Sequence, residues 1–293
     1  MQGSQSGPGF LRHIAACNGA TLPGGRVAFR IGPNRREAEQ VGWVAPSLAT
    51  ALAGFAGIEL DDGPAPENGV TLTDPAALLA INRELADRGW LRWRGEAFDV
   101  RARPDGKVLA RIDRGAVPVF GVVAEGVHVN GLVGDPGTIE GMRLWVARRA
   151  TDKALDPGKL DHIVAGGVPA GLGVGETLIK EAAEEAAIPA GLAARARKVA
   201  TLSYAMDRTE GLRRDRLHCF DLLLPEDFTP RPVDGEVSGF ELWQLARVLE
   251  AVHDTDAFKF NVNLVLIDLF LRLGIIAGEE GSELRAALQA GRT

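Results

Sequence analysis

Three glutamates at helical spacing are the residues of this sequence best suited to chemistry. Glu181, Glu184 and Glu185 stand at positions i, i+3 and i+4 of a segment predicted to be helical from about Glu176 to Ala187. Their carboxylates would share one helix face and repel one another. Mg²⁺ takes oxygen ligands, so a bound cation would turn that repulsion into ligation. We expect all three to bind metal and Glu184 and Glu185 to be catalytic; a solvated acidic face is the alternative.

Positive charge and glycines precede this helix. Arg148, Arg149 and Lys153 lie upstream, and Gly166-Gly167 form a glycine-rich turn directly before the helical segment. Arginine offers a two-pronged fork to phosphate oxygens, and lysine offers a point charge. We therefore expect these five residues to contact phosphate. Ion pairing at the surface is the alternative for the three cations.

The stretch 166–188, GGVPAGLGVGETLIKEAAEEAAI, resembles the Nudix box, whose pattern is G-x5-E-x7-R-E-U-x-E-E-x-G-U with U an aliphatic residue. Gly166 matches the first glycine, Glu181 the glutamate of R-E-U, Glu184 and Glu185 the E-E pair, and Ile188 the final aliphatic residue. The resemblance implies a hydrolase that uses Mg²⁺ or Mn²⁺ to cleave a diphosphate link.

Three positions depart from this pattern. Lys180 replaces the usual arginine, Ala187 the second glycine, and Leu172 the first glutamate. The first glutamate generally pairs with the arginine. We expect Glu176 to take over this pairing, because Glu176 and Lys180 form an i, i+4 pair in the favoured orientation.

Further segments resemble one subfamily, the thiamine pyrophosphokinase-related Nudix hydrolases, which have an N-terminal domain of unknown function. The matching runs are WRGEAFDV, RGAVPVFGV, GVHVNGLV, PGKLDHIVAGG and FKFNVNLVLIDLFLR. The resemblance implies metabolite repair: hydrolysis of thiamine diphosphate, or of its damaged oxo and oxy analogues, to the monophosphate and phosphate. Nothing in composition or spacing selects thiamine.

The predicted fold class is α/β, a Nudix α/β/α sandwich with a mixed sheet, preceded by a smaller α+β domain. We place the domains at 1–133 and 134–293, with a linker at Asp135-Pro136-Gly137-Thr138. Predicted helices span 10–17, 46–55, 74–88, 176–187, 190–200, 244–252 and 258–276. Predicted strands span 27–31, 90–101, 107–111, 117–123, 127–133, 142–149, 200–204, 212–224 and 234–243.

A fourth acid is expected just before the strand predicted at 234–243. Glu236 occupies the place at which Nudix folds often have a metal ligand or base, and we rank it above Glu241 as a catalytic residue. Metal ions would lower the pKa of a bound water, and a carboxylate would take its proton. In-line attack on phosphorus would then split the diphosphate.

Composition narrows the class of protein. The 293 residues have a net charge of −6, and 46% are apolar. The chain has no long basic block, so we expect no nucleic-acid partner. It also lacks an apolar run long enough to span a membrane. Cys17 and Cys219 match no metal-binding spacing, and we expect reduced thiols in a cytoplasmic protein. A homodimer stays open.

Rival interpretations concern the substrate. A Nudix hydrolase of ADP-ribose or a nucleotide sugar stays open, as does a non-catalytic diphosphate-binding module. An isopentenyl diphosphate isomerase would need a cysteine near the box, and there is none. We expect residues 10–133 to wall the pocket, with His128 and Asn130 on its candidate strand and Trp93 or Trp145 stacking on a substrate ring.

Overall fold

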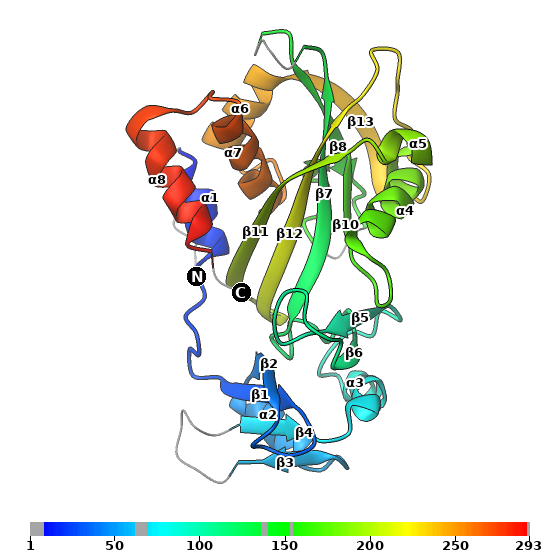
Figure 1. Ribbon diagram of the computed structural model, residues 1–293, viewed down its shortest axis with the longest axis vertical. Coiled ribbons are helices and arrows are strands. Elements are labelled where there is room, and N and C mark those ends of the chain that lie inside the picture. Colours follow the sequence, from blue (N-terminus) through cyan, green and yellow to red (C-terminus); the bar gives the residue numbers. More distant parts are fainter. Residues whose placement is uncertain (1–8, 62–68, 136–139, 153–154, 292–293) are drawn as a thin grey trace.

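The protein consists of a large α/β body and a smaller part below it (Figure 1). The computed structural model describes residues 9–61, 69–135, 140–152 and 155–291. The larger part contains a mixed sheet with the strand order β11-β12-β7-β8-β13, to which β10 pairs through β7 and β9 through β8. Strands β7 and β12 are parallel, and the other pairs are antiparallel. The strands are β7 (Val123–Val133), β8 (Arg143–Arg149), β9 (Leu160–His162), β10 (Val164–Gly167), β11 (Arg197–Arg208), β12 (Gly211–Leu223) and β13 (Val237–Gln244).

Helices cover both faces of this sheet, which gives the predicted α/β/α arrangement. On one face, α4 packs through Leu178 and Ala182 onto Val127 and Val129. On the other face, a core of apolar side chains joins α1, α6, α7 and α8 to the sheet. Their apolar residues are on the inward side, so burial in the two cores stabilises the sandwich. The helices are α1 (Leu11–Cys17), α4 (Val174–Ala186), α5 (Ala190–Ala193), α6 (Leu245–Asp254), α7 (Val262–Arg272) and α8 (Gly278–Gln289).

The smaller part has its own core. Its sheet has the order β2-β1-β4-β3, and a separate hairpin pairs β5 with β6. Phe29 and Phe120 meet edge to face at the centre of this core, with ring centroids 5.0 Å apart. The elements are β1 (Val27–Ile31), β2 (Glu39–Val44), α2 (Pro46–Leu52), β3 (Ile58–Leu60), β4 (Gly69–Leu72), a 3₁₀ turn (Pro75–Ala77), α3 (Leu78–Asp87), β5 (Ala97–Val100) and β6 (Ala110–Asp113).

The predicted boundary at 133/134 does not follow the packing. Strand β7 precedes that boundary, yet it lies inside the larger sheet between β12 and β8. Helix α1 also packs against α7 and α8, so the described chain begins in the larger body (Figure 1). The sequence predicts a strand at 127–133, but it does not predict which strands pair with it. We propose that the smaller part spans roughly the residues between α1 and β7. Most of the predicted linker lies outside the described residues.

Other elements differ in extent from those predicted. Residues 114–121 form turns rather than a strand, because Ala116 and Phe120 close consecutive backbone hydrogen bonds there. The helix predicted at 190–200 ends at Ala193, and β11 already begins at Arg197. A β-bulge between Lys198 and Ala200 lets this strand continue to Arg208 alongside β12. Strands β2, β3 and β4 and helix α8 were not predicted from sequence.

The two parts meet where β10 ends. The prediction that Gly166 and Gly167 form a turn is wrong, because both residues belong to β10 and pair with Val127 and Gly126 of β7. The Ala170 N–H donates to the Ala97 carbonyl at 2.7 Å, which ties residues after β10 to the hairpin β5-β6. Gly167 faces the Phe98 ring so closely that a Cβ would lie 2.5 Å from Phe98 Cζ. The smaller part therefore supports the very turn that precedes α4.

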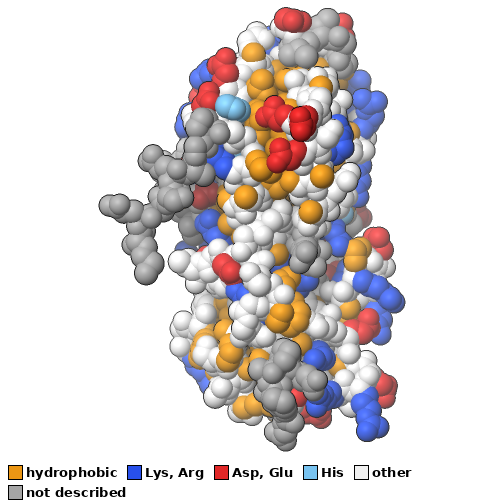
Figure 2. Space-filling view, turned by 90° about the vertical axis from the view of Figure 1, so that its left-hand side faces the viewer, with side chains coloured by type: hydrophobic (Ala, Val, Ile, Leu, Met, Phe, Trp, Pro, Cys, Tyr) orange, Lys and Arg blue, Asp and Glu red, His pale blue; other side chains and the backbone are white. Residues whose placement is uncertain are grey.

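Figure 2 views the side of the molecule that carries α8. Acidic side chains gather among apolar ones on the upper half of this face, and α8 itself begins with Glu279 and Glu280 in its first turn. Acidic residues in a first turn complement the helix dipole, so this charge has a structural explanation. In the part of the chain that the structure describes, no helix has the length and apolarity to cross a membrane.

Candidate active site

Helix α4 is fixed at both ends by local chemistry. At its start, the Glu176 carboxylate accepts the Gly173 N–H at 2.8 Å, which satisfies one of the free donors of the first turn. At its end, Ala187 adopts a left-handed conformation with φ of 54°. The predicted pairing of Glu176 with Lys180 is wrong, because Glu176 caps the helix and Lys180 bonds elsewhere.

Glu185 is the most deeply placed of the three predicted metal ligands. Its side chain is 6% exposed, and its carboxylate accepts the Ala165 N–H at 2.8 Å. Burial raises the pKa of Glu185 to about 8, and nearby Asp161, Glu181 and Glu236 add to the rise. A buried carboxylate among other acids needs a cation if it is to stay ionised near neutral pH.

Glu181 and Glu184 have different surroundings. The Glu181 carboxylate lies against Gly166, where a Cβ would be 2.4 Å from Glu181 Cδ, and burial raises its pKa. Glu184 is 48% exposed and binds Lys180 Nζ at 2.6 Å. Lys180 also contacts Glu181 at 3.1 Å and so bridges the two. The three glutamates therefore do not form one equivalent set, since the helix turns Glu184 outward.

A small cavity of about 10 Å³ lies beside Glu185, and we call it the carboxylate cavity. This is near the volume that one water molecule needs. Its potential ligands are the carboxylates of Asp161, Glu185 and Glu236 and the imidazole of His162, and carboxylate oxygens suit Mg²⁺ or Mn²⁺. The residues therefore fit a hard divalent cation. Its lining consists of Arg149, Asp161, His162, Ala165, Glu185, Glu236 and Val237.

A second group of buried side chains shares Asp161 and His162 with this cavity. Nδ1 of His128 is 3.0 Å from Nδ1 of His162, and Asp161 completes the one set of described residues whose ligand atoms all lie within 4.8 Å of one another. Arg149 and Lys259 already pair with Asp161, at 2.8 and 3.7 Å. Burial alone would raise the pKa of Asp161, but these two cations bring it down to about 2. Because Asp161 is already neutralised, this group is better suited to supporting the cavity than to binding a further cation.

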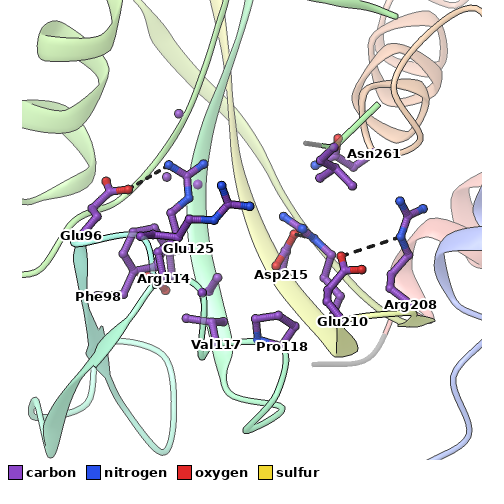
Figure 3. A pocket seen from close by; sticks show the side chains of 18 of the residues that line it. Glu96, Phe98, Arg114, Val117, Pro118, Glu125, Arg208, Glu210, Asp215 and Asn261 are labelled. Atoms are coloured by element: carbon purple, nitrogen blue, oxygen red, sulfur yellow. Dashed lines mark hydrogen bonds and ion pairs between the residues drawn. The ribbon is translucent and has the colours of Figure 1, made fainter. Parts of the chain in front are cut away.

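A large cleft of about 610 Å³ opens next to the carboxylate cavity and shares Arg149, Ala165 and Glu236 with it. Figure 3 shows Glu96, Phe98 and Arg114 of the smaller part on one side, with Arg208, Glu210 and Asp215 of β11 and β12 on the other. The cleft is thus built by both parts of the chain, as expected of many ligand sites.

Some of the predicted phosphate-binding residues line this cleft, and others do not. Arg149, Gly166 and Gly167 line it. Arg148 does not line the cleft. It directly precedes Arg149 in β8, so its side chain points to the opposite face of the sheet, where it binds Glu241 at 3.4 Å. Lys153 lies outside the described residues.

Of the two candidates for the fourth acid, one lines the cleft and the other does not. Glu236 lines both the cleft and the carboxylate cavity. Glu241 accepts a hydrogen bond from Trp243 Nε1 at 3.0 Å and lines neither. This placement keeps Glu236, rather than Glu241, as the candidate proton acceptor.

Sequence reasoning missed most of the cleft wall. Trp90 and Phe98 line it, whereas Trp93 lies under the Arg83 guanidinium and Trp145 packs into the core against α4. His128 reaches the lining, but Asn130 bonds to Asp221 instead. The run WLRWRGEAF at 90–98, with alternating arginines and aromatic residues, was a signal that could have pointed to this wall.

The sequence of the chain is similar to those of two curated plant proteins. The chain is 39% identical over 209 residues to "Nudix hydrolase 20, chloroplastic" of Arabidopsis thaliana, which covers 71% of this chain and 55% of the relative. It is 42% identical over 186 residues to "Nudix hydrolase 24, chloroplastic" of the same plant, covering 64% and 50%. The chain thus spans about half the length of the curated relatives it matches. No protein-family model matches it.

Among solved structures, the Nudix domain of Shewanella oneidensis NrtR, in complex with ADP-ribose, aligns with 53% of this chain and 90% of that one, at 15% identity and a TM-score of 0.41. The sequence similarity is much higher for the plant proteins. Over roughly two thirds of its length the chain is similar to plant Nudix hydrolases, and this similarity supports its relationship to the Nudix hydrolase superfamily.

Proposed function

We propose that this protein is a divalent-metal-dependent hydrolase that cleaves the diphosphate link of a small organic diphosphate. The observation that supports it most strongly is the carboxylate cavity. It places the buried Glu185 beside Glu236 and Asp161 and opens onto a cleft large enough for a small organic ligand. A non-catalytic binding module would not require so many acids around one small space.

Each acid has a separate task in this proposal. Glu185 would hold the cation from within the carboxylate cavity, Glu181, which lines neither cavity nor cleft, would be an additional ligand from the same helix, and Glu236 lies at the junction of cavity and cleft. When bound, a divalent ion supplies Lewis-acid chemistry, lowering the pKa of water and neutralising phosphate oxygens. Glu236 accepts the proton of the attacking water, which is directed at phosphorus in line with the departing phosphate oxygen. Arg149, on the cleft wall, neutralises part of the charge that develops on the phosphate groups.

The substrate class that we propose is thiamine diphosphate or its oxo and oxy analogues, released as the monophosphate. The proposal rests on the subfamily resemblance of the sequence. The cleft is compatible with it, because Trp90 is 39% exposed and Phe98 lies nearby as a second aromatic residue for a flat heterocycle. ADP-ribose and nucleotide sugars are the rival substrates.

A hydrolysis panel tests both levels of the proposal. Phosphate and monophosphate release would be measured for thiamine diphosphate, its oxo and oxy analogues, ADP-ribose and a nucleotide sugar, with Mg²⁺, with Mn²⁺ and with chelator. We expect metal-dependent turnover that is fastest for a thiamine analogue. Fastest turnover of ADP-ribose would replace the substrate but keep the chemistry. A chain that hydrolyses none of these compounds with either metal would contradict the proposed chemistry.

A further inference from the structure

Three arginines of the smaller part line the cleft together. Arg92 and Arg94 alternate along the segment before β5, and Arg114 follows β6 directly. We propose that these three arginines form an anion subsite, which binds phosphate oxygens of the substrate that the carboxylate cavity does not hold. This inference rests on the proposed function and adds a binding role for the smaller part.

A buried carboxylate fixes the backbone of the two segments that carry the three arginines. The Asp113 side chain, which is almost fully buried, accepts the N–H groups of Arg94 at 3.0 Å, Gly95 at 2.8 Å and Gly115 at 2.8 Å. Asp113 therefore joins the segment that carries Arg92 and Arg94 to the turn that carries Arg114. Groups fixed before binding lose less conformational entropy when a ligand arrives. The arrangement is preorganised although its side chains are exposed.

The charge of this arginine wall is only partly neutralised. Arg114 binds Glu96 at 2.8 Å, as the dashed line in Figure 3 shows. Within the described ranges, no acidic side chain pairs with Arg92 or Arg94. Partial burial and then the positive charges of Arg92 and Arg114 lower the pKa of Arg94, and the carboxylates of Asp113 and Glu210 only partly oppose this. The like charges of such a cluster repel one another when no ligand is present, and a bound anion would offset this repulsion.

The opposite wall of the cleft lacks this excess of positive charge. Arg213 binds Asp215 at 2.7 Å, and Arg208 lies 4.0 Å from Glu210 (Figure 3). Asp215 is on the same strand as Arg213, and Glu210 lies in the turn that follows Arg208, so both of these arginines have an acid nearby. On the smaller part's side, a phosphate group entering the cleft meets Arg92 and Arg94, which are not matched by an ion pair with an acid among the described residues. The guanidinium fork suits phosphate oxygens, which can accept two parallel hydrogen bonds.

Two phosphate sources share this chemistry. The oxygens could belong to the diphosphate that is cleaved, or to a second phosphate on the organic group. The first source predicts that loss of the arginines raises KM for every diphosphate alike. The second predicts a rise only for diphosphates whose organic group carries an additional phosphate.

Binding of inorganic pyrophosphate provides the direct test. Calorimetry would use the whole 293-residue chain with the background substitution Glu185→Gln and chelator, so that neither turnover nor metal contributes. We expect Arg92→Gln/Arg94→Gln to weaken pyrophosphate binding by about 10-fold or more, from the loss of charge-assisted hydrogen bonds. Arg36→Gln, which removes the same charge from an exposed site outside the cleft, should leave it unchanged. Arg94→Lys should bind with intermediate affinity, because the charge stays and the fork is lost.

Equal pyrophosphate affinity in the double variant and its parent would overturn the subsite, as would a parent that does not bind pyrophosphate. Far-ultraviolet circular dichroism and thermal unfolding would establish that each variant is folded, and Arg94→Lys keeps the test available if the double variant is not. The proposed function fails separately: it fails if the wild-type chain shows no metal-dependent turnover, whatever the binding experiment shows.

Discussion

The two sides of the cleft are built in different ways. Most of the metal-binding side comes from the stretch that runs from β9 through β10 to Glu185 on α4, and β8 and the start of β13 add Arg149 and Glu236. The arginine wall comes from separate segments, which the buried Asp113 carboxylate holds together. The metal-binding side is therefore visible as spacing in the sequence, whereas the arginine wall exists only after the hairpin β5-β6 has formed.

This difference bears on how catalysis and recognition are divided. Acids on a helix keep their mutual positions as long as the helix and its preceding turn are intact. The arginine wall depends on the smaller part staying docked on Gly167 through Phe98. Changes on the metal-binding side should affect turnover most, and changes at the junction should affect stability and substrate binding.

The largest effect is expected from Glu185→Gln. It removes an anionic ligand while keeping an oxygen that can accept the Ala165 N–H, so the fold should remain. Turnover should fall by about 100-fold or more, or about 3 kcal/mol in activation free energy. Steady-state kinetics in saturating Mg²⁺ would measure it, with Glu279→Gln on α8 as the matched control. Near-normal turnover of Glu185→Gln would remove this residue from the site.

The next effect is on stability as a function of pH. The folded-state pKa of Glu185, about 8, is above that of an unfolded glutamate, so the neutral carboxyl stabilises the metal-free protein at low pH. This contribution is lost as the pH rises from about 5 through 8, by about 1.4 kcal/mol per pH unit at most. Denaturant unfolding with chelator should show the loss in the wild type and a smaller loss in Glu185→Gln. Identical pH profiles would show that Glu185 titrates normally.

Substitutions at Gly166 and Gly167 separate the two sides of the cleft. Alanine at 166 would push the flexible Glu181 side chain aside, so activity should fall on the order of 10- to 100-fold with little change in stability. Alanine at 167 would meet the rigid Phe98 ring and should cost about 1–3 kcal/mol of unfolding free energy. Kinetics and chemical denaturation of both variants would check this. The reverse pattern would contradict the assignment of the two glycines.

The smallest effect concerns the end of α4. Ala187 has a φ of 54°, a conformation that glycine adopts without strain. Ala187→Gly should therefore stabilise the protein by about 0.5–1 kcal/mol, the relief of strain exceeding the added freedom of the unfolded chain. The midpoint of denaturant unfolding would measure it. A lower midpoint in the variant would indicate that the Ala187 methyl contributes packing that outweighs the strain.

Local chemistry could be predicted from the sequence, and tertiary neighbours could not. The helical spacing of Glu181 and Glu185 correctly predicted α4, and the strand at 27–31 was predicted to the residue. The outward turn of Glu184 depends on how α4 packs on the sheet, which spacing does not specify. The capping role of Glu176 is a local contact with Gly173, three residues earlier, which the sequence reasoning overlooked in favour of a pairing with Lys180. Strand β7 was recognised as a strand, but its parallel pairing with β12 is a contact between segments some 90 residues apart. The role of Asp113 likewise depends on tertiary contacts, because it accepts the backbone N–H groups of Arg94 and Gly95 from a segment that lies before β5.

Hydrolysis in water enriched in ¹⁸O tests the central claim most directly. The protein would be incubated with Mg²⁺ and the diphosphate of the panel that it cleaves fastest, and the products would be analysed by mass spectrometry. We predict one heavy oxygen for each bond cleaved, located on a phosphate group, with no cleavage when the metal is chelated. Products without the label, or labelled cleavage that persists in chelator, would contradict a metal-dependent attack of water on phosphorus.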